Sequence, residues 1–151
     1  MSHRYETEAD ILNERKFLKT IEDTFCCEGL RLPVYSEIDC ILAKGKNPIA
    51  FAELKCRTAT STTFPTIILS AHKLRAGMKL SKSYMRLDKK DIPFIFAVRF
   101  RDKDMYCKVT QNIIDNSEKV MFEATNNDKS INMNRHNEWC AHIPICYFKE
   151  F

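Results

Sequence analysis

Glycine and proline are scarce in this chain, which has three glycines and five prolines in 151 residues. These residues dominate flexible linkers and low-complexity segments, and no such segment and no internal repeat interrupts the sequence. A chain of this length is also large enough to bury a core without disulfide or metal staples. We therefore predict one compact domain over residues 1–151.

Long apolar runs are absent as well. No run approaches the roughly 18 residues that a membrane-spanning helix needs. The N-terminal residues Met-Ser-His-Arg-Tyr-Glu also lack the apolar stretch of a signal peptide. We expect a cytoplasmic protein.

The seven cysteines lack the spacing of a zinc site or a disulfide framework. There is no CxxC pair, the number is odd, and Cys40, Cys56 and Cys107 each lie inside an apolar run. Buried free thiols in a reducing compartment are the expected state.

The net charge of +4 permits binding to a polyanion without requiring it. The basic residues do cluster in one stretch, where Asp88 is the single acidic residue. Such a stretch is either a surface that follows a phosphate backbone or an ordinary solvated helix face, and charge does not decide between them. Its members are Lys73, Arg75, Lys79, Lys82, Arg86, Lys89 and Lys90.

Hydrophobic periodicity predicts a first helix over residues 7–25, with Gly29 ending it, and a second over residues 70–87, capped by Ser70. A hairpin is expected between the two helices, with its turn at residues 44–48, and a loop at residues 126–137. The order helix, hairpin, helix, strands predicts an α/β or α+β fold, in which helices flank a central mixed β-sheet. The expected strands cover residues 36–43, 49–56, 94–100, 105–109, 120–124 and 140–148.

Two acidic residues stand in apolar strand segments. Asp39 lies between Ile38 and Cys40, and Glu53 follows Ile-Ala-Phe-Ala directly. A buried carboxylate is costly unless it is paired, protonated or bound to a metal. Two such residues on adjacent strands of one hairpin therefore indicate a functional site.

Lys55 is expected to share the face of Glu53, because residues i and i+2 of a strand point to the same side. Asp39 can reach the same space across the hairpin. Two carboxylates and an amine suit phosphodiester hydrolysis. The carboxylates hold a hard divalent cation such as Mg²⁺ or Mn²⁺, and the lysine positions the attacking water or stabilises developing negative charge.

The segment Ile38-Asp39, a gap of thirteen residues and Glu53-Leu54-Lys55 resembles the PD-(D/E)XK nuclease superfamily. Its signature is an acidic residue, a short hairpin and then Glu/Asp-x-Lys, and Ile38 replaces the family's proline. The resemblance covers about residues 7–109 and does not extend to the last forty. It implies a restriction-endonuclease-like core, DNA as the substrate, a divalent metal, and a backbone carbonyl of Leu54 among the metal ligands. Small members of this family often form homodimers.

Many members of this family add a carboxylate from the first helix, and Glu14 is the predicted one. At about 100° per residue it falls inside the apolar stripe of Ile11, Leu18, Ile21 and Phe25, so we expect it to face the sheet. The alternative is a rotated helix that leaves Glu14 at the periphery.

Several basic residues are predicted to contact the nucleic acid: Arg57, Lys73, Lys79, Lys82 and Arg99. For Lys73 the resemblance gives a further reason, since related nucleases often carry a polar or basic residue at the start of the second helix, facing the scissile phosphate. An exposed helix surface is the competing interpretation for this residue.

Three hypotheses follow from the sequence. The first is a Mg²⁺- or Mn²⁺-dependent deoxyribonuclease with Asp39, Glu53, Lys55 and Glu14 in its active site. The second is a non-catalytic nucleic-acid-binding or interaction module that has kept the fold. The third is a structural ion cluster of Asp39, Glu53 and Lys55. The form of the substrate, as duplex, single-stranded or branched, stays open.

Overall fold

A computed structural model describes residues 7–33, 35–84, 91–121 and 139–151 of the protein. Its main sheet has six strands in the order β1-β2-β3-β5-β6-β9. β3 and β5 pair in parallel and the other neighbours are antiparallel, which confirms the predicted mixed sheet. The strands are β1 (Glu28–Arg31), β2 (Cys40–Lys44), β3 (Asn47–Cys56), β5 (Phe94–Arg99), β6 (Asp104–Val109) and β9 (Lys149–Glu150).

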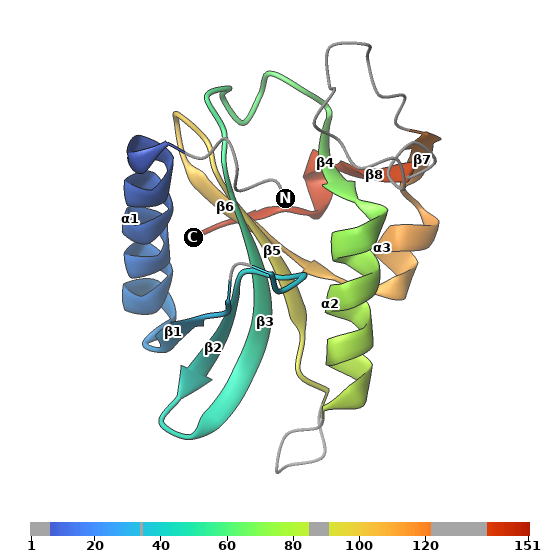
Figure 1. The fold of residues 1–151 in the computed structure, drawn as a ribbon. Coiled ribbons are helices and arrows are strands. Elements are labelled where there is room, and N and C mark those ends of the chain that lie inside the picture. Colours follow the sequence, from blue (N-terminus) through green and yellow to red (C-terminus); the bar gives the residue numbers. More distant parts are fainter. Residues whose placement is uncertain (1–6, 34, 85–90, 122–138) are drawn as a thin grey trace.

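A second sheet has three strands in the order β4-β8-β7, and all its pairs are antiparallel. It consists of β4 (Thr66–Ser70), β8 (Trp139–Pro144) and β7 (Glu118–Met121). The helices are α1 (Glu8–Phe25), α2 (Ala71–Ser83) and the short α3 (Gln111–Asp115). In Figure 1, α1 lies on one side of the main sheet, and α2, α3 and the second sheet lie on the other.

Local sequence explains the ends of both long helices. The side chain of Ser70 caps α2, as predicted. Thr7 caps α1 in a reciprocal capping box with Asp10, which was not predicted. The predicted stop at Gly29 is wrong, because α1 ends at Phe25 and Cys26 takes the left-handed conformation at its C-cap (φ 51°). Gly29 lies in β1 instead, where a Cβ atom would stand only 2.5 Å from Leu18 Cδ1. This glycine therefore serves close packing rather than helix termination.

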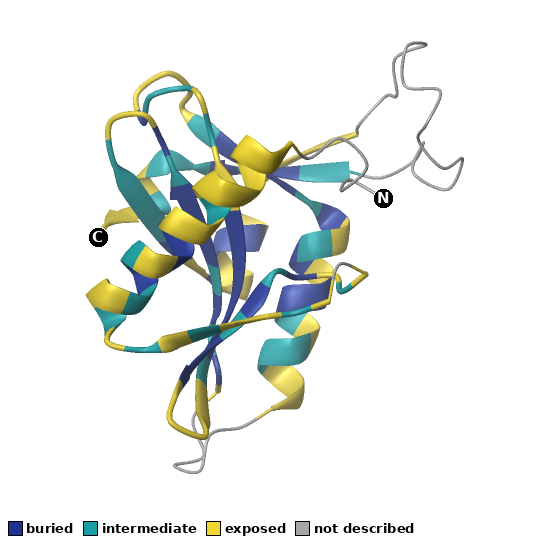
Figure 2. Ribbon diagram, turned by 60° about the vertical axis from the view of Figure 1, so that its left-hand side comes forward, coloured by how far each residue is buried: buried dark blue, intermediate teal, exposed yellow. Residues whose placement is uncertain are grey.

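The two faces of the main sheet bury separate apolar layers. On one face, Phe17, Leu18 and Ile21 of α1 pack on β2 and β3. On the other face, a larger cluster joins Phe51 and Phe96 of the sheet to α2, α3, β4 and β8. Figure 2 shows that the residues of the central strands are largely buried. Alternate residues of β3 therefore belong to different layers, which decides where its polar side chains point.

The predicted hairpin is present as β2 and β3, with an irregularity of register at Leu42/Ala43. Its first strand starts later than predicted, at Cys40 rather than residue 36. Residues 36–39 form bends, and Leu32 N–H donates to Asp39 C=O (2.9 Å). Asp39 therefore stands immediately before the strand and not inside it.

Other elements differ from the sequence-based expectation. β1, β4 and α3 were not predicted, and residues 145–147 form a 3₁₀ turn in place of the end of a long strand. The second helix ends at Ser83 rather than residue 87, and β7 covers residues 118–121. Residues 85–90, 122–124 and the loop predicted at 126–137 lie outside the described residues. Among the described helices, none is long and apolar enough to cross a membrane.

Candidate active site

Glu53 and Lys55 lie on the face of β3 that is turned toward α2. Ala50, Ala52 and Leu54 pack in the α1 layer and Phe51 packs in the α2 layer. Because side chains alternate along a strand, Glu53 and Lys55 lie on the same face of β3 as Phe51. Glu53 is 8% exposed and is the one charged side chain among the described residues that is buried. The predicted placement of Glu53 and Lys55 on one face is therefore observed.

Asp39 reaches β3 through its carboxylate. The β2–β3 ladder reaches Cys40, which pairs with Ala52. Beyond that pair, Leu54 N–H donates to Asp39 Oδ2 (2.8 Å). The side chain thus satisfies a backbone donor of a buried residue where the neighbouring strand has ended. The C=O of Leu54 points to the same side of the strand as its N–H, so that carbonyl faces the space beside Asp39.

Lys73 in the first turn of α2 binds Glu53 directly. Its Nζ lies 3.2 Å from Glu53 Oε1 and 3.3 Å from Oε2, and its side chain is 23% exposed. Ser70 sets this placement, because its Oγ accepts from Lys73 N–H at the helix N-terminus. The sequence had indicated a contact with nucleic acid for Lys73, with an exposed helix surface as the competing interpretation. Its contact with Glu53 was not predicted.

The carboxyl groups of Asp39 and Glu53 interact. Burial, the charge of Asp39 and a hydrogen bond between the two side chains raise the pKa of Glu53 to about 8, while Lys73 acts in the opposite direction. Desolvation and a neighbouring like charge both disfavour the ionised form. Lys73 therefore offsets the effects of burial and of Asp39 only in part, and the metal-free carboxyl holds its proton more tightly than a free one.

Lys55 stands at the rim of this cluster. Its side chain is exposed, yet the surrounding protein lowers the pKa of its ammonium, and Arg57 lowers it further. Glu53 raises it, so Lys55 lies within electrostatic reach of the carboxylates. Among the described residues no ion pair joins Lys55 to Asp39. The ion pair of the site is Lys73–Glu53.

Glu14 approaches from the other layer. It is 17% exposed and pairs with Arg31 of β1, with Glu14 Oε1 2.7 Å from Arg31 Nη2. Its charge raises the pKa of the Cys40 and Cys56 thiols, which places it near the sequence neighbours of Asp39 and Lys55. Helix α1 covers the face opposite to Glu53, so Glu14 can approach the carboxylates only around the edge of the sheet. Its metal-binding role stays a prediction.

The other predicted nucleic-acid contacts fall into different environments. Lys79 and Lys82 are exposed on α2, and Arg57 is partly buried just after β3. Arg99, in contrast, is occupied within the fold: it binds both oxygens of Asp104 (2.9 and 2.8 Å), donates to Thr20 and lies over the Phe17 ring. Arg86, Lys89 and Lys90 lie outside the described residues.

The donor set fits a hard divalent cation with few protein ligands. Among the described residues there is no group of three or more His, Cys, Asp or Glu side chains that could hold a metal. Two adjacent carboxylates and a carbonyl facing the same space suit Mg²⁺, which commonly keeps several waters and takes one or two carboxylates. The raised pKa of Glu53 also indicates a cation site, because a bound cation would offset both the burial and the repulsion from Asp39 that raise this pKa.

Comparison with known proteins identifies a nuclease family. The model of a family described as "Phage putative PDDEXK endonuclease" matches residues 1–150. The match includes the last forty residues, to which the resemblance seen in the sequence did not extend. No curated protein and no solved structure matches the chain. With the family model covering nearly all of it, and Asp39, Glu53 and Lys55 gathered at the start of β2 and the end of β3, the chain belongs to this PD-(D/E)XK endonuclease family.

Proposed function

We propose that the protein is a divalent-metal-dependent deoxyribonuclease that hydrolyses phosphodiester bonds in DNA. The observation that carries the proposal is the contact between two carboxyl groups, one of them buried, beside two lysines. Asp39, Glu53 and the carbonyl of Leu54 are the proposed ligands of Mg²⁺ or Mn²⁺, with Glu14 contributing from the edge of the sheet. The family match supports a nuclease.

A cation bound there would polarise the scissile phosphate and lower the pKa of a water. The residues of the chain supply the rest. As the oxygen of water bonds to phosphorus, the water gives up one proton to the solvent; the bridging P–O bond breaks, and the departing oxygen takes up a proton from the solvent. Lys55, at the rim, holds the attacking water or stabilises the charge that develops on the phosphate. Lys73 favours the ionised form of Glu53, since its ammonium lowers the pKa that burial and Asp39 raise.

The test is cleavage of plasmid, single-stranded and branched DNA with Mg²⁺, Mn²⁺ or EDTA. Asp39→Asn, Glu53→Gln and Lys55→Ala should each reduce cleavage by a factor of about 10³ or more, because groups that act as a unit fail together. Lys46→Ala, at the exposed β2–β3 turn, removes a lysine far from these contacts and should retain full activity. Full activity in any of the three site variants would remove that residue from the mechanism.

The Lys73–Glu53 pair also favours a second candidate, a non-catalytic nucleic-acid-binding module in which this pair is structural. The two differ in the response to metal. Binding of Mg²⁺ or Mn²⁺ without cleavage of any DNA would favour the module. Absence of both would leave a structural ion cluster.

A further inference from the structure

A pocket lies on the opposite side of α2 from the carboxylates. It has a volume of about 560 Å³ and is formed by α2, α3 and the strands β7 and β8. Lys73 faces Glu53, whereas the residues of α2 that line the pocket are Leu74, Arg75, Met78, Lys79, Lys82 and Ser83. Arg75, Lys79 and Lys82 recur at i, i+4 and i+7 and share one stripe of the helix. The pocket is therefore distinct from the catalytic cluster.

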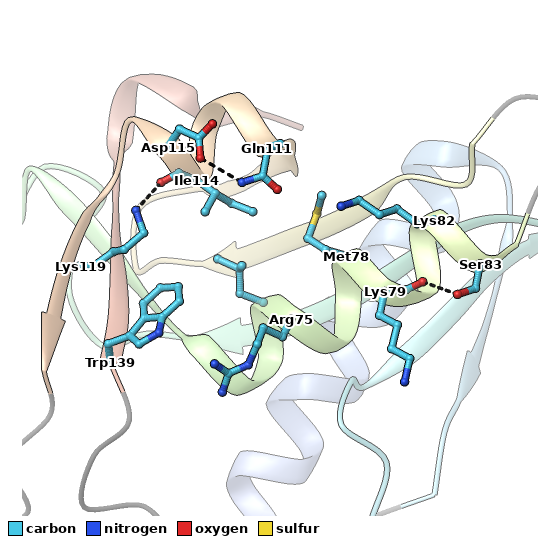
Figure 3. A pocket seen from close by; sticks show the side chains of 11 residues that line it. Arg75, Met78, Lys79, Lys82, Ser83, Gln111, Ile114, Asp115, Lys119 and Trp139 are labelled. Atoms are coloured by element: carbon cyan, nitrogen blue, oxygen red, sulfur yellow. Dashed lines mark hydrogen bonds between the residues drawn. The ribbon is translucent and has the colours of Figure 1, made fainter.

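The floor and end wall of this pocket are apolar and aromatic. Leu74 and Ile114 are buried, and Met78 is partly buried. Figure 3 shows Met78 and Lys82 projecting from α2 toward α3, with the indole of Trp139 closing the other end. Trp139 is the single tryptophan of the chain. A flat aromatic wall of this kind suits a planar ligand such as a nucleobase.

The rim of the pocket is cationic. Among the eleven described residues that line it, four are basic (Arg75, Lys79, Lys82 and Lys119) and one, Asp115, is acidic. Asp115 already accepts a hydrogen bond from Gln111 Nε2 (2.9 Å). The basic rim therefore favours an anionic ligand. Because the floor between the basic residues is apolar, the best fit is a ligand that carries its anionic groups on a flat apolar ring.

Lys119 belongs to the cationic rim and also contacts the aromatic wall of the pocket. Its Nζ donates to Ile114 C=O (3.2 Å) and lies 5.9 Å from the centre of the Trp139 ring. One hydrogen bond uses one of the three donors of an ammonium, so Lys119 can also receive a phosphate. The cation thus lies over the indole, within reach of the phosphate of a nucleotide bound against that ring.

We propose that this pocket binds an unpaired nucleotide of the nucleic-acid substrate, with its base on Trp139 and its phosphates on Lys79, Lys82 and Lys119. The proposal rests on the proposed function, because it takes nucleic acid as the substrate. It adds the form of that substrate, which is DNA with unpaired nucleotides. Bases inside a duplex are stacked and must be extruded to enter a pocket. DNA with a single-stranded segment, as an overhang or a branch, is therefore the preferred substrate.

The experiment measures binding separately from cleavage. Oligo(dT) is titrated into the unmodified protein in EDTA, with Trp139 fluorescence and the anisotropy of a labelled oligonucleotide as readouts. We expect quenching on binding, and an affinity on the order of tenfold or more weaker for an oligonucleotide of equal charge that lacks bases, because each stacked base contributes to affinity. Trp139→Ala should weaken oligo(dT) binding by a similar factor, and Trp139→Phe by less than about threefold, since the ring still stacks.

Several outcomes would overturn the proposal. Equal affinity for the oligonucleotide without bases would reduce the pocket to a surface that binds phosphate alone. Equal binding by oligo-glutamate would indicate an acidic peptide as the ligand. The comparison of oligonucleotides uses the unmodified protein, so it decides the question even if Trp139→Ala destabilises the fold. Binding in EDTA with no cleavage under any metal would refute the proposed function and leave the pocket assignment standing.

Discussion

At the scale of single residues, Glu53 carries the largest electrostatic penalty of the site. Its carboxyl group is buried, next to Asp39, and its pKa is raised to about 8. Lys73 opposes this shift through both oxygens. A buried charge of this kind does not stabilise the fold by itself. The stability of the metal-free protein therefore depends on the protonation state of Glu53.

We predict that Glu53 makes the metal-free protein less stable as the pH rises. The folded state holds the proton of Glu53 more tightly than the unfolded state, whose pKa is near 4.5. Its contribution to stability is therefore fully present below pH 4.5 and is lost as the pH rises toward 8. The loss is at most about 4–5 kcal/mol, from 1.36 kcal/mol per unit of pKa.

The measurement is a set of melting curves in EDTA between pH 5 and 8.5 for the unmodified protein and Glu53→Gln. The difference in melting temperature between the two should change in favour of the variant as the pH rises. Mg²⁺ at pH 8 should stabilise the unmodified protein and have little effect on the variant. Parallel curves would show that Glu53 is ionised in both states.

Asp39 has two functions that different substitutions separate. It carries a charge beside Glu53 and accepts the N–H of Leu54, a buried residue. Asp39→Asn keeps an oxygen acceptor and removes the charge, so in EDTA it should not lower the melting temperature. Asp39→Ala leaves the N–H unpaired and should cost about 1–3 kcal/mol.

Urea denaturation of both Asp39 variants in EDTA checks this prediction. The two should lose stabilisation by Mg²⁺ or Mn²⁺ equally, because both lack the carboxylate. Equal stability of the two variants would mean that the hydrogen bond to Leu54 contributes nothing to the fold.

At the scale of elements, the main sheet separates the two helices that carry site residues. α2 delivers Lys73 directly onto Glu53, while α1 packs on the other face and holds Glu14 against Arg31. The contribution of α1 to the site therefore depends on whether Glu14 exchanges Arg31 for a metal.

We predict that Glu14→Gln lowers Mg²⁺ affinity and reduces cleavage about tenfold, less than Glu53→Gln, because Glu14 acts from the edge of the sheet. Arg31→Gln is the matched control, since it breaks the same ion pair and keeps the carboxylate. Titration of each variant with Mg²⁺, followed by its melting temperature, gives the affinities. If both variants lose the same small amount of stability, of about 0.2–1 kcal/mol, and neither changes metal affinity, Glu14 is a structural residue.

At the scale of the whole molecule, the exposed cations of α2 lie beside the pocket between α2 and α3, on the opposite side of the helix from Glu53. A strand bound at both places has to pass over α2. From Lys73 to Lys82 the helix rises about 13–14 Å at 1.5 Å per residue, so several nucleotides would lie along it.

We predict that Lys79→Gln combined with Lys82→Gln flattens the salt dependence of DNA binding. Each lost phosphate contact removes about 0.7 from the slope of log K against log[salt] for a single strand, so the slope should fall by about 1.4. Anisotropy titrations between 50 and 200 mM salt, roughly the range in which phosphate contacts are most visible, provide the slope.

The control is Lys44→Gln combined with Lys46→Gln, which removes the same charge at the exposed β2–β3 turn. It should leave the slope near that of the unmodified protein. Equal slopes for both double variants would identify the lysines of α2 as ordinary solvated residues.

The sequence by itself determined the features that depend on neighbours along the chain. Spacing placed Glu53 and Lys55 on one face of β3, the contrast of charge with apolar context singled out Asp39, and Ser70 fixed the start of α2. These features do not depend on how the helices and strands pack together, because the alternation of side chains in a strand and the capping of a helix are local effects.

Only the tertiary structure decided which of these elements meet. Lys73 faces Glu53 because β4 positions the start of α2 above β3. The sequence placed Lys73 at the start of the helix but did not indicate its contact with Glu53. Glu14 lies in the predicted apolar stripe, yet that stripe covers the opposite face of the sheet. Trp139 belongs to no motif and acquires its pocket from α2 and α3, which are distant in sequence. Contacts between layers depend on the path of the chain, which periodicity does not encode.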